Sequence, residues 1–140
     1  MAINATRQDE YDVRVTVDGI NLGTFDTLTG GEIDSEELKY KPGAMAPEVS
    51  LGGTTTTGQV TVTRNYRLVR DHDRVHWLLG RVGRGNVVIN KQPLDHDGNA
   101  YGRPLVYRGI LKRVLPPEHD SNTADAAMIE IEVTPHGGVT

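Results

Sequence analysis

The sequence contains no cysteine, and its aromatic residues include only one tryptophan and one phenylalanine. Without cysteine, the chain cannot form a disulfide framework, a cysteine-ligated zinc site, an iron–sulfur cluster or a thiol nucleophile. It also has no run approaching the roughly 18 to 20 apolar residues that a membrane-spanning helix needs. The N-terminal stretch MAINATRQDEYD lacks the apolar segment of a secretory signal peptide.

A surplus of basic residues is missing as well. There are 15 lysines and arginines against 19 aspartates and glutamates, which gives a formal net charge of −4. This mild acidity argues against a protein that holds a nucleic-acid backbone by bulk attraction. A length of 140 residues fits one domain, but only 36% of them are hydrophobic and 5% aromatic. The core is thin for an isolated domain of this size, which favours burial of further apolar surface against partners.

Alternation of apolar and polar residues predicts a mainly β protein. Valines alternate with polar residues over positions 11–17, and the Asp18-Gly19 pair that follows is a strong signal for a tight turn. We therefore predict a β-hairpin over residues 11–25, preceded by a flexible N-terminal arm over residues 1–10. Five more strands are predicted over residues 32–40, 54–64, 86–92, 104–115 and 127–134.

The apolar period changes between the predicted strands at residues 54–64 and 86–92. Leu68, His72, Val75 and Leu79 step by four, three and four positions, which predicts one face of a helix over residues 65–82. We expect this face to pack on the domain or to form an interface. The predicted architecture is an antiparallel β-sandwich or barrel of about six or seven strands with one α-helix packed on it.

The predicted helix also carries a histidine pair. His72 and His76 are four residues apart, so both could bind one metal ion. No glutamate follows His72 as in the HExxH pattern, and no further ligand completes a set. A helix flank that faces a neighbouring chain is the favoured interpretation, with a metal site as the alternative.

Other short motifs have structural explanations. Residues 95–99 resemble a calcium loop in part, but strands flank them and an Asp-Gly turn accounts for them. The glycine-rich residues 80–85 follow the helix, whereas a phosphate loop would precede one. None of the three serines lies in a G-x-S-x-G motif. The sequence therefore predicts no catalytic residue, no metal and no cofactor, and a protein that is not an enzyme.

The order of features resembles a known family. The segments that carry the resemblance are YDVRVTVDGINLGTF, GEIDSEELKYKPG, TTTTGQVTVTR, NYRLVRDHDRVHWLLG and PLVYRGILKRVLPPEHDSNTADAAMIEIEVTPHG. Their order and spacing, over residues 11–137 as a single domain, are similar to the phage tail tube protein family. That family includes the tubes of related contractile injection systems.

The resemblance implies a structural virion protein. Its subunits would form stacked, hexameric rings, each lending strands to a continuous barrel around a channel through which the genome passes. The implied partners are further copies of the chain, the baseplate or tip, the terminator, the tape-measure protein and a sheath, with DNA passing without specific binding. The implied location is the virion tail, assembled in the host cytoplasm. The alternatives are an inner tube of a contractile secretion or bacteriocin-like system and a monomeric ligand-binding β-barrel.

Two groups of residues are the candidate sites. Residues 44–53 are apolar and poor in charge, which is unusual for a solvent loop and indicates a partner contact. The family's loop between rings or subunits would fall there. The contact residues expected in it are Met45, Pro47, Val49 and Leu51. Polar faces of two predicted strands are the candidate channel lining. The lumen-facing candidates are Glu32, Asp34, Glu36, Gln59, Thr61 and Thr63.

Overall fold

The N-terminal hairpin forms as the sequence predicts. The computed structural model describes residues 7–35, 38–43, 45–51 and 55–136, with strand β1 at Tyr11–Val17 and strand β2 at Ile20–Phe25. At the turn, Asp18 and Gly19 have φ angles of 48° and 82°. Two successive left-handed residues match the right-handed twist of the flanking strands, and this explains why the Asp-Gly pair predicts the turn.

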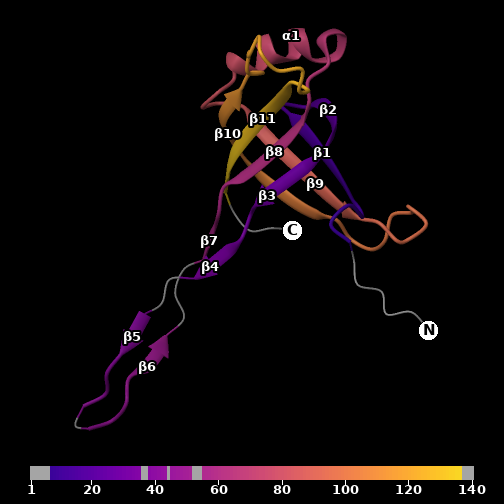
Figure 1. Ribbon diagram of the computed structural model, residues 1–140. Helices are drawn as coiled ribbons and strands as arrows, with labels where there is room; N and C mark the ends of the chain where they lie inside the picture. Colours follow the sequence, from indigo (N-terminus) through magenta and orange to yellow (C-terminus); the bar gives the residue numbers. More distant parts are fainter. Residues whose placement is uncertain (1–6, 36–37, 44, 52–54, 137–140) are drawn as a thin grey trace.

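Seven strands form one antiparallel sheet in the order β2-β1-β9-β10-β11-β8-β3. The strands not yet given are β3 (Thr27–Gly30), β8 (Val60–Asn65), β9 (Asn86–Pro93), β10 (Leu105–Leu115) and β11 (Met128–Pro135). The two edge strands, β2 and β3, are consecutive in the chain and only Asp26 separates them. The sheet therefore curls on itself into a half-barrel (Figure 1). The predicted mainly β class with one helix is confirmed.

The inside of the half-barrel is filled by branched apolar side chains. Val15, Val60, Ile89, Leu111 and Ile131 are completely buried. They come from five different strands, and their neighbours along each strand point the other way because side chains alternate across a sheet. The period-2 patterns in the sequence thus correspond to one shared core.

A long extension leaves the half-barrel at the end opposite the helix (Figure 1). It consists of β4 (Ile33–Ser35) paired with β7 (Thr55–Thr57), and β5 (Leu38–Tyr40) paired with β6 (Val49–Leu51). We call residues 33–57 the extension. The predicted strand over residues 32–40 corresponds to β4 and β5, both in the extension, and residues 36–37 lie outside the described residues. The predicted strand over residues 54–64 is wrong as a single element, because β7 belongs to the extension and the rest enters the sheet as β8.

Two glycines lie where the chain passes from β3 into the extension. Gly30 and Gly31 have φ angles of 86° and 82°. A Cβ on Gly31 would lie 2.7 Å from Cε1 of Tyr107, and one on Gly30 would overlap the backbone of Gln59. Both the backbone conformation and the close approach therefore require glycine at this exit.

Helix α1 spans Leu68–Leu79, within the predicted range, and Gly80 ends it. Its buried residues are Asp71, Val75 and Leu78. Of Leu68, His72, Val75 and Leu79, which were predicted to pack on the domain or to form an interface, only Val75 packs on the domain. The other three are exposed, because the helix is rotated so that Asp71 points inward.

Candidate functional site

The extension exposes apolar side chains. Met45 is 98% exposed, Tyr40 58%, Ile33 53% and Leu51 46%. Pro47 is also exposed. Val49 contributes its backbone to β6, opposite Tyr40. A segment that projects from the domain with this much exposed apolar surface is typical of a protein–protein contact. The structure therefore places the predicted contact residues together on one projecting element.

The lumen-facing candidates lie at the start of the extension and along β8. Glu32 and Asp34 are exposed at the start of the extension, and Glu36 lies outside the described residues. Gln59 is exposed just before β8. Thr61 and Thr63 are on the outer face of β8, opposite the fully buried valines of that strand. The described candidates are thus exposed or half-buried polar residues, and that they face a channel stays a prediction.

The outer face of β8 continues across neighbouring strands. Thr61 and Thr63 are paired with Glu132 and Glu130 of β11. Arg113 of β10 lies between these two carboxylates, with Nε 3.1 Å from Glu132 and Nη2 3.4 Å from Glu130. This face is polar and its charges of opposite sign are paired. Sequence reasoning did not select Arg113 or the two glutamates as candidates. The I-E-I-E-V alternation of β11 does mark Glu130 and Glu132 as the polar face of that strand.

A buried ion pair connects the helix to the sheet. Arg64 Nη2 donates to Asp71 Oδ1 at 2.6 Å, and the two side chains are 4% and 0% exposed. The guanidinium of Arg64 also donates to the carbonyl oxygens of Leu22 and Thr24 on β2, and it lies 4.5 Å from the ring centre of Phe25. One side chain from β8 thus joins β2 to α1 across the seam of the half-barrel.

The same carboxylate organises the start of the helix. Asp71 Oδ2 accepts from the backbone N–H of Arg67 at 2.9 Å and from Nη2 of Arg70 at 2.8 Å. Burial alone would raise the pKa of Asp71, but the bonds from Arg70 and Arg67 and the charge of Arg64 lower it below its ordinary value. Burial lowers the pKa of Arg64, and Asp71 opposes that change. Asp71 is therefore held as a carboxylate.

The histidine pair lies on the outer face of the helix. The rings of His72 and His76 are 4.9 Å apart and nearly perpendicular, and Nδ1 of His72 is 3.3 Å from the hydroxyl of Tyr66. Within the described part of the chain, no three His, Cys, Asp or Glu side chains are grouped to hold a metal. Leu68 and Val69 beside the pair are 67% and 102% exposed. This face is suited to a protein contact.

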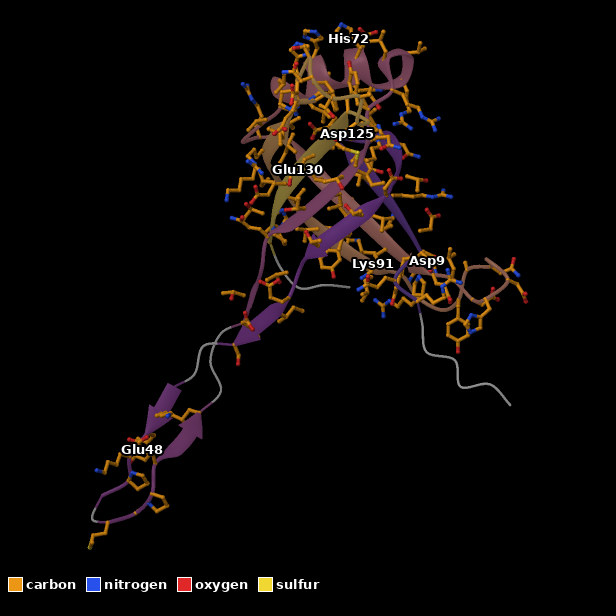
Figure 2. All side chains as sticks on the ribbon, viewed as in Figure 1. Asp9, Glu48, His72, Lys91, Asp125 and Glu130 are labelled. Atoms are coloured by element: carbon orange, nitrogen blue, oxygen red, sulfur yellow. The ribbon has the colours of Figure 1, made fainter. Side chains whose placement is uncertain are left out.

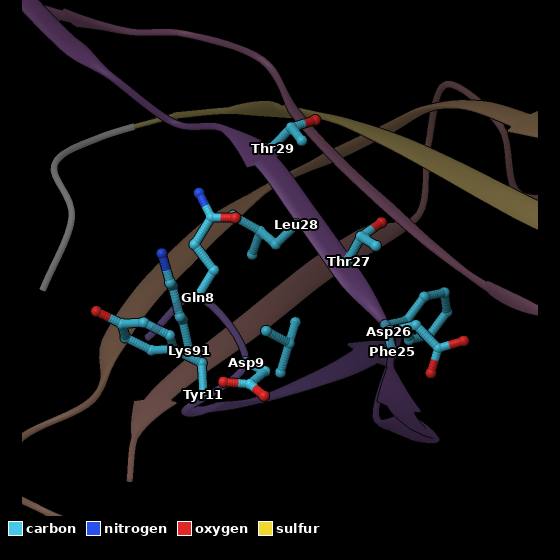
Figure 3. A pocket seen from close by; sticks show the side chains of 10 residues that line it. Gln8, Asp9, Tyr11, Phe25, Asp26, Thr27, Leu28, Thr29 and Lys91 are labelled. Atoms are coloured by element: carbon cyan, nitrogen blue, oxygen red, sulfur yellow. The ribbon is translucent and has the colours of Figure 1, made fainter. Parts of the chain in front are cut away.

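An open cleft lies between β1, β3 and β9 on one flank of the half-barrel (Figure 3). The cleft has a volume of about 560 Å³, and polar and apolar side chains line it, among them Gln8 and Lys91. The Lys91 ammonium lies over the ring of Tyr11 at 4.5 Å. Asp9 and Asp26 also face the cleft, so its charges are mixed.

Among the described residues, no helical segment has the length and hydropathy of a membrane span.

Comparison with known proteins identifies the fold. No protein-family model and no curated protein matches the chain. A chain of the anti-feeding prophage cap (AFP tube terminating cap) superposes with a TM-score of 0.72 at 11% identity, covering 100% of this chain and 92% of that one. A chain of the PVC sheath–tube complex, an extracellular contractile injection system in the extended state, gives 0.68 at 15% identity, with coverages of 97% and 90%. The chain has a tail-tube-like fold.

A third structure supports the same assignment. A chain of the PVC sheath/tube terminator superposes with a TM-score of 0.65 at 14% identity and covers 91% of both chains. The three superpositions cover 91% to 100% of this chain, so the likeness extends over nearly all of it. The resemblance drawn from the sequence is confirmed at the level of the fold.

Proposed function

We propose that this chain is a structural subunit of a tail tube, in which copies assemble into stacked, hexameric rings around a channel. The tail-tube-like fold supports a structural role, and the extension provides a surface for assembly. The observation that carries the proposal is the exposure of Ile33, Tyr40, Met45 and Leu51 on one projecting element. In a ring or stack of rings, this apolar surface would be buried by neighbouring copies.

Two machines could contain such a tube. In a phage tail, the tube would conduct the genome, and the protein would belong to the virion tail after assembly in the host cytoplasm. In a contractile injection system, the tube would carry other cargo. The structural neighbours from AFP and PVC favour this second candidate. Isolated particles distinguish the two machines, because only the phage tail joins a DNA-filled capsid.

In either machine the expected partners are the baseplate, terminator, tape-measure protein and sheath.

The outer face of β8, β11 and β10 is the proposed channel lining. Threonine hydroxyls and the paired charges around Arg113 give this face little net charge. A wall of this kind has no surplus of cations to hold a phosphate backbone, so a polymer could pass without binding. We expect the assembled protein to bind duplex DNA weakly. Because the proposed lining has no surplus of cations, lowering the salt concentration toward about 50 mM should strengthen this binding little.

Assembly tests the proposal directly. The wild-type protein is expected to form rings or tubes in negative-stain electron micrographs at high concentration. Met45→Asp with Leu51→Asp should abolish stacking, because each change places a charge on an apolar contact. Tyr101→Asp with Leu105→Asp is the matched control, since these residues are 71% and 43% exposed outside the extension. A wild-type protein that sediments as a monomer at every concentration would contradict the proposal.

A further inference from the structure

We propose that Tyr107 is a positioning residue, which supports the base of the extension from the core and so fixes the direction in which the extension projects. The base is defined as residues 30–35 and 55–60, the two chain segments that leave and re-enter the half-barrel. They continue from β3 and β8 (Figure 1). The role of this residue in assembly rests on the proposed function, because the direction of a projecting contact element decides where it meets the next copy.

The base keeps one strand register as it leaves the sheet. Gly30 of β3 is paired with Val60 of β8. The next strand pair begins with Ile33 of β4 opposite Thr57 of β7. The outgoing segment has thus advanced by three residues while the returning segment has gone back by three, so no residue is inserted on either side. The bend that a β-bulge introduces into a strand pair is therefore missing between these two pairs.

Backbone hydrogen bonds join the two segments between these pairs. The N–H of Gly31 donates to the carbonyl oxygen of Gln59 at 3.3 Å. One step further out, the N–H of Gly58 donates to the carbonyl oxygen of Glu32 at 2.7 Å. The hydrogen-bonded ladder of the sheet therefore passes into the extension. A hinge needs a few residues whose φ and ψ angles are free to change, and a ladder in constant register does not provide them.

Close packing leaves the base little room to tilt. A Cβ on Gly31 would lie 2.7 Å from Cε1 of Tyr107 and 3.0 Å from its Cζ, so the backbone here is in direct contact with the ring. On the returning segment, a Cβ on Gly58 would overlap the carboxylate of Glu32. Any larger side chain at these two positions would push the packed parts away from each other. Glycine therefore permits contacts that other residues exclude.

The ring that supports the base belongs to the core of the half-barrel. Tyr107 is 7% exposed and packs among the buried apolar side chains. Its strand, β10, lies in the middle of the sheet between β9 and β11, and Tyr107 is paired there with Ile89. Because protein interiors are close-packed, a side chain seated in this way cannot move without displacing its neighbours. Tyr107 thus connects the core to the base of the extension.

A fixed base favours assembly. Figure 2 shows how the extension reaches away from the helix, with Glu48 near its tip and His72 on the helix. On an element of this shape, a small change in direction at the base moves the tip by a much larger distance. An element already held in its bound direction loses less conformational freedom on association, and this preorganisation strengthens binding. A base that swung freely would lose that freedom at every contact.

Distances between spin labels test the inference in dilute protein, before assembly. The chain has no cysteine, so Thr56→Cys on β7 and Asp73→Cys on α1 provide two unique, exposed label sites. Double electron–electron resonance measures the distribution of distances between the labels. We expect one narrow distribution, which Tyr107→Ala should broaden or shift. Leu111→Ala is the matched control, because Leu111 is a fully buried residue of the same strand whose backbone bonds to Gly83 and Gly85, at the helix end. It should leave the distribution unchanged.

A second pair of variants leaves the core side chains intact. Gly31→Ala and Gly19→Ala each place alanine at a φ of 82°, but only the new Cβ at position 31 meets the ring of Tyr107. Circular dichroism establishes that both variants are folded. We expect Gly31→Ala to broaden or shift the distance distribution and Gly19→Ala to leave it unchanged. A broad distribution in the wild type, or identical distributions in these two variants, would overturn the inference.

Self-association separates this inference from the proposed function. In sedimentation experiments, Gly31→Ala should associate at least about tenfold more weakly than Gly19→Ala. Equal association constants for the two variants would overturn the role of the base in assembly and leave the proposed function intact. A wild-type protein that never oligomerises would contradict the proposed function, whereas the distances measured in the monomer would still decide whether Tyr107 fixes the base.

Discussion

The guanidinium of Arg64 lies 2.6 Å from the carboxylate of Asp71, and both side chains are buried between strand β8 and helix α1. A buried charge is tolerated only when a partner and hydrogen bonds compensate for its lost hydration. Asp71 has several such bonds, from Arg64, from Arg70 and from the N–H of Arg67. The position of the helix on the half-barrel depends on this pair.

We expect Asp71→Ala to destabilise the fold by about 3–5 kcal/mol, because it leaves the Arg64 guanidinium buried without its counter-charge. The measurement is the free energy of unfolding in urea. Asp73→Ala removes an exposed carboxylate two positions away and serves as the control, with an expected change within about 0.5 kcal/mol. Similar losses in both variants would show that the pair does not hold the helix.

The stability that Asp71 provides should depend on pH. Its pKa in the folded protein is lower than the ordinary 3.8, so the unfolded chain takes up the proton more readily. The contribution is complete above about pH 5 and is lost as the pH falls below 3.8 toward the folded-state value. Thermal unfolding of wild type and Asp71→Asn between neutral and acid pH measures this: the gap in Tm should narrow only in acid. A gap that is constant down to low pH would contradict the assignment.

The exit into the extension can be tested with two glycines that share one backbone conformation. Gly19 and Gly31 both have a φ of 82°, so alanine at either position incurs the left-handed cost of about 1–2 kcal/mol. Only at Gly31 would the new Cβ also press on Tyr107, at 2.7 Å, whereas Gly19 has open space around it. We expect Gly31→Ala to cost at least about 1 kcal/mol more than Gly19→Ala in urea unfolding. Equal costs would mean that Tyr107 moves aside freely.

If assembly buries the extension, the Tm should rise with protein concentration, because association stabilises the folded state by mass action. Differential scanning calorimetry over about a hundredfold range of protein concentration measures this rise in Tm for the wild type. The Met45→Asp and Leu51→Asp double variant should show a constant Tm. A wild-type Tm that does not move would indicate that the folded subunit gains nothing from its neighbours.

The sequence predicted the elements that have one apolar and one polar face. The hairpin of β1 and β2 is the best example, since alternating valines and the Asp-Gly turn specify both strands and their connection. Sequence reasoning did not separate the extension into its short strands. Glu32, Asp34 and their neighbours are exposed, so no buried face imposed a period that sequence reasoning could use.

The inward-facing side of the helix was predicted only in part, for a different reason. Periodicity selected Leu68, His72, Val75 and Leu79 as a face that packs on the domain or forms an interface, yet Asp71 also points inward. Its burial depends on Arg64, seven positions earlier on another element, and a pattern of hydrophobicity does not register such a pair. The contact residues on the extension stay a prediction, made because an apolar segment without a core-forming period indicates a partner.

The hydrogen bonds from Arg64 to the carbonyl oxygens of Leu22 and Thr24 have a consequence for how copies can join. Strand β2 is an edge of the sheet, and the unpaired backbone of an edge strand is a template on which any other strand can add. In a protein that polymerises, uncontrolled addition at this edge would compete with ordered assembly. The Arg64 side chain occupies those acceptors from within the same subunit, so the backbone of β2 is protected and aggregation through this edge is disfavoured.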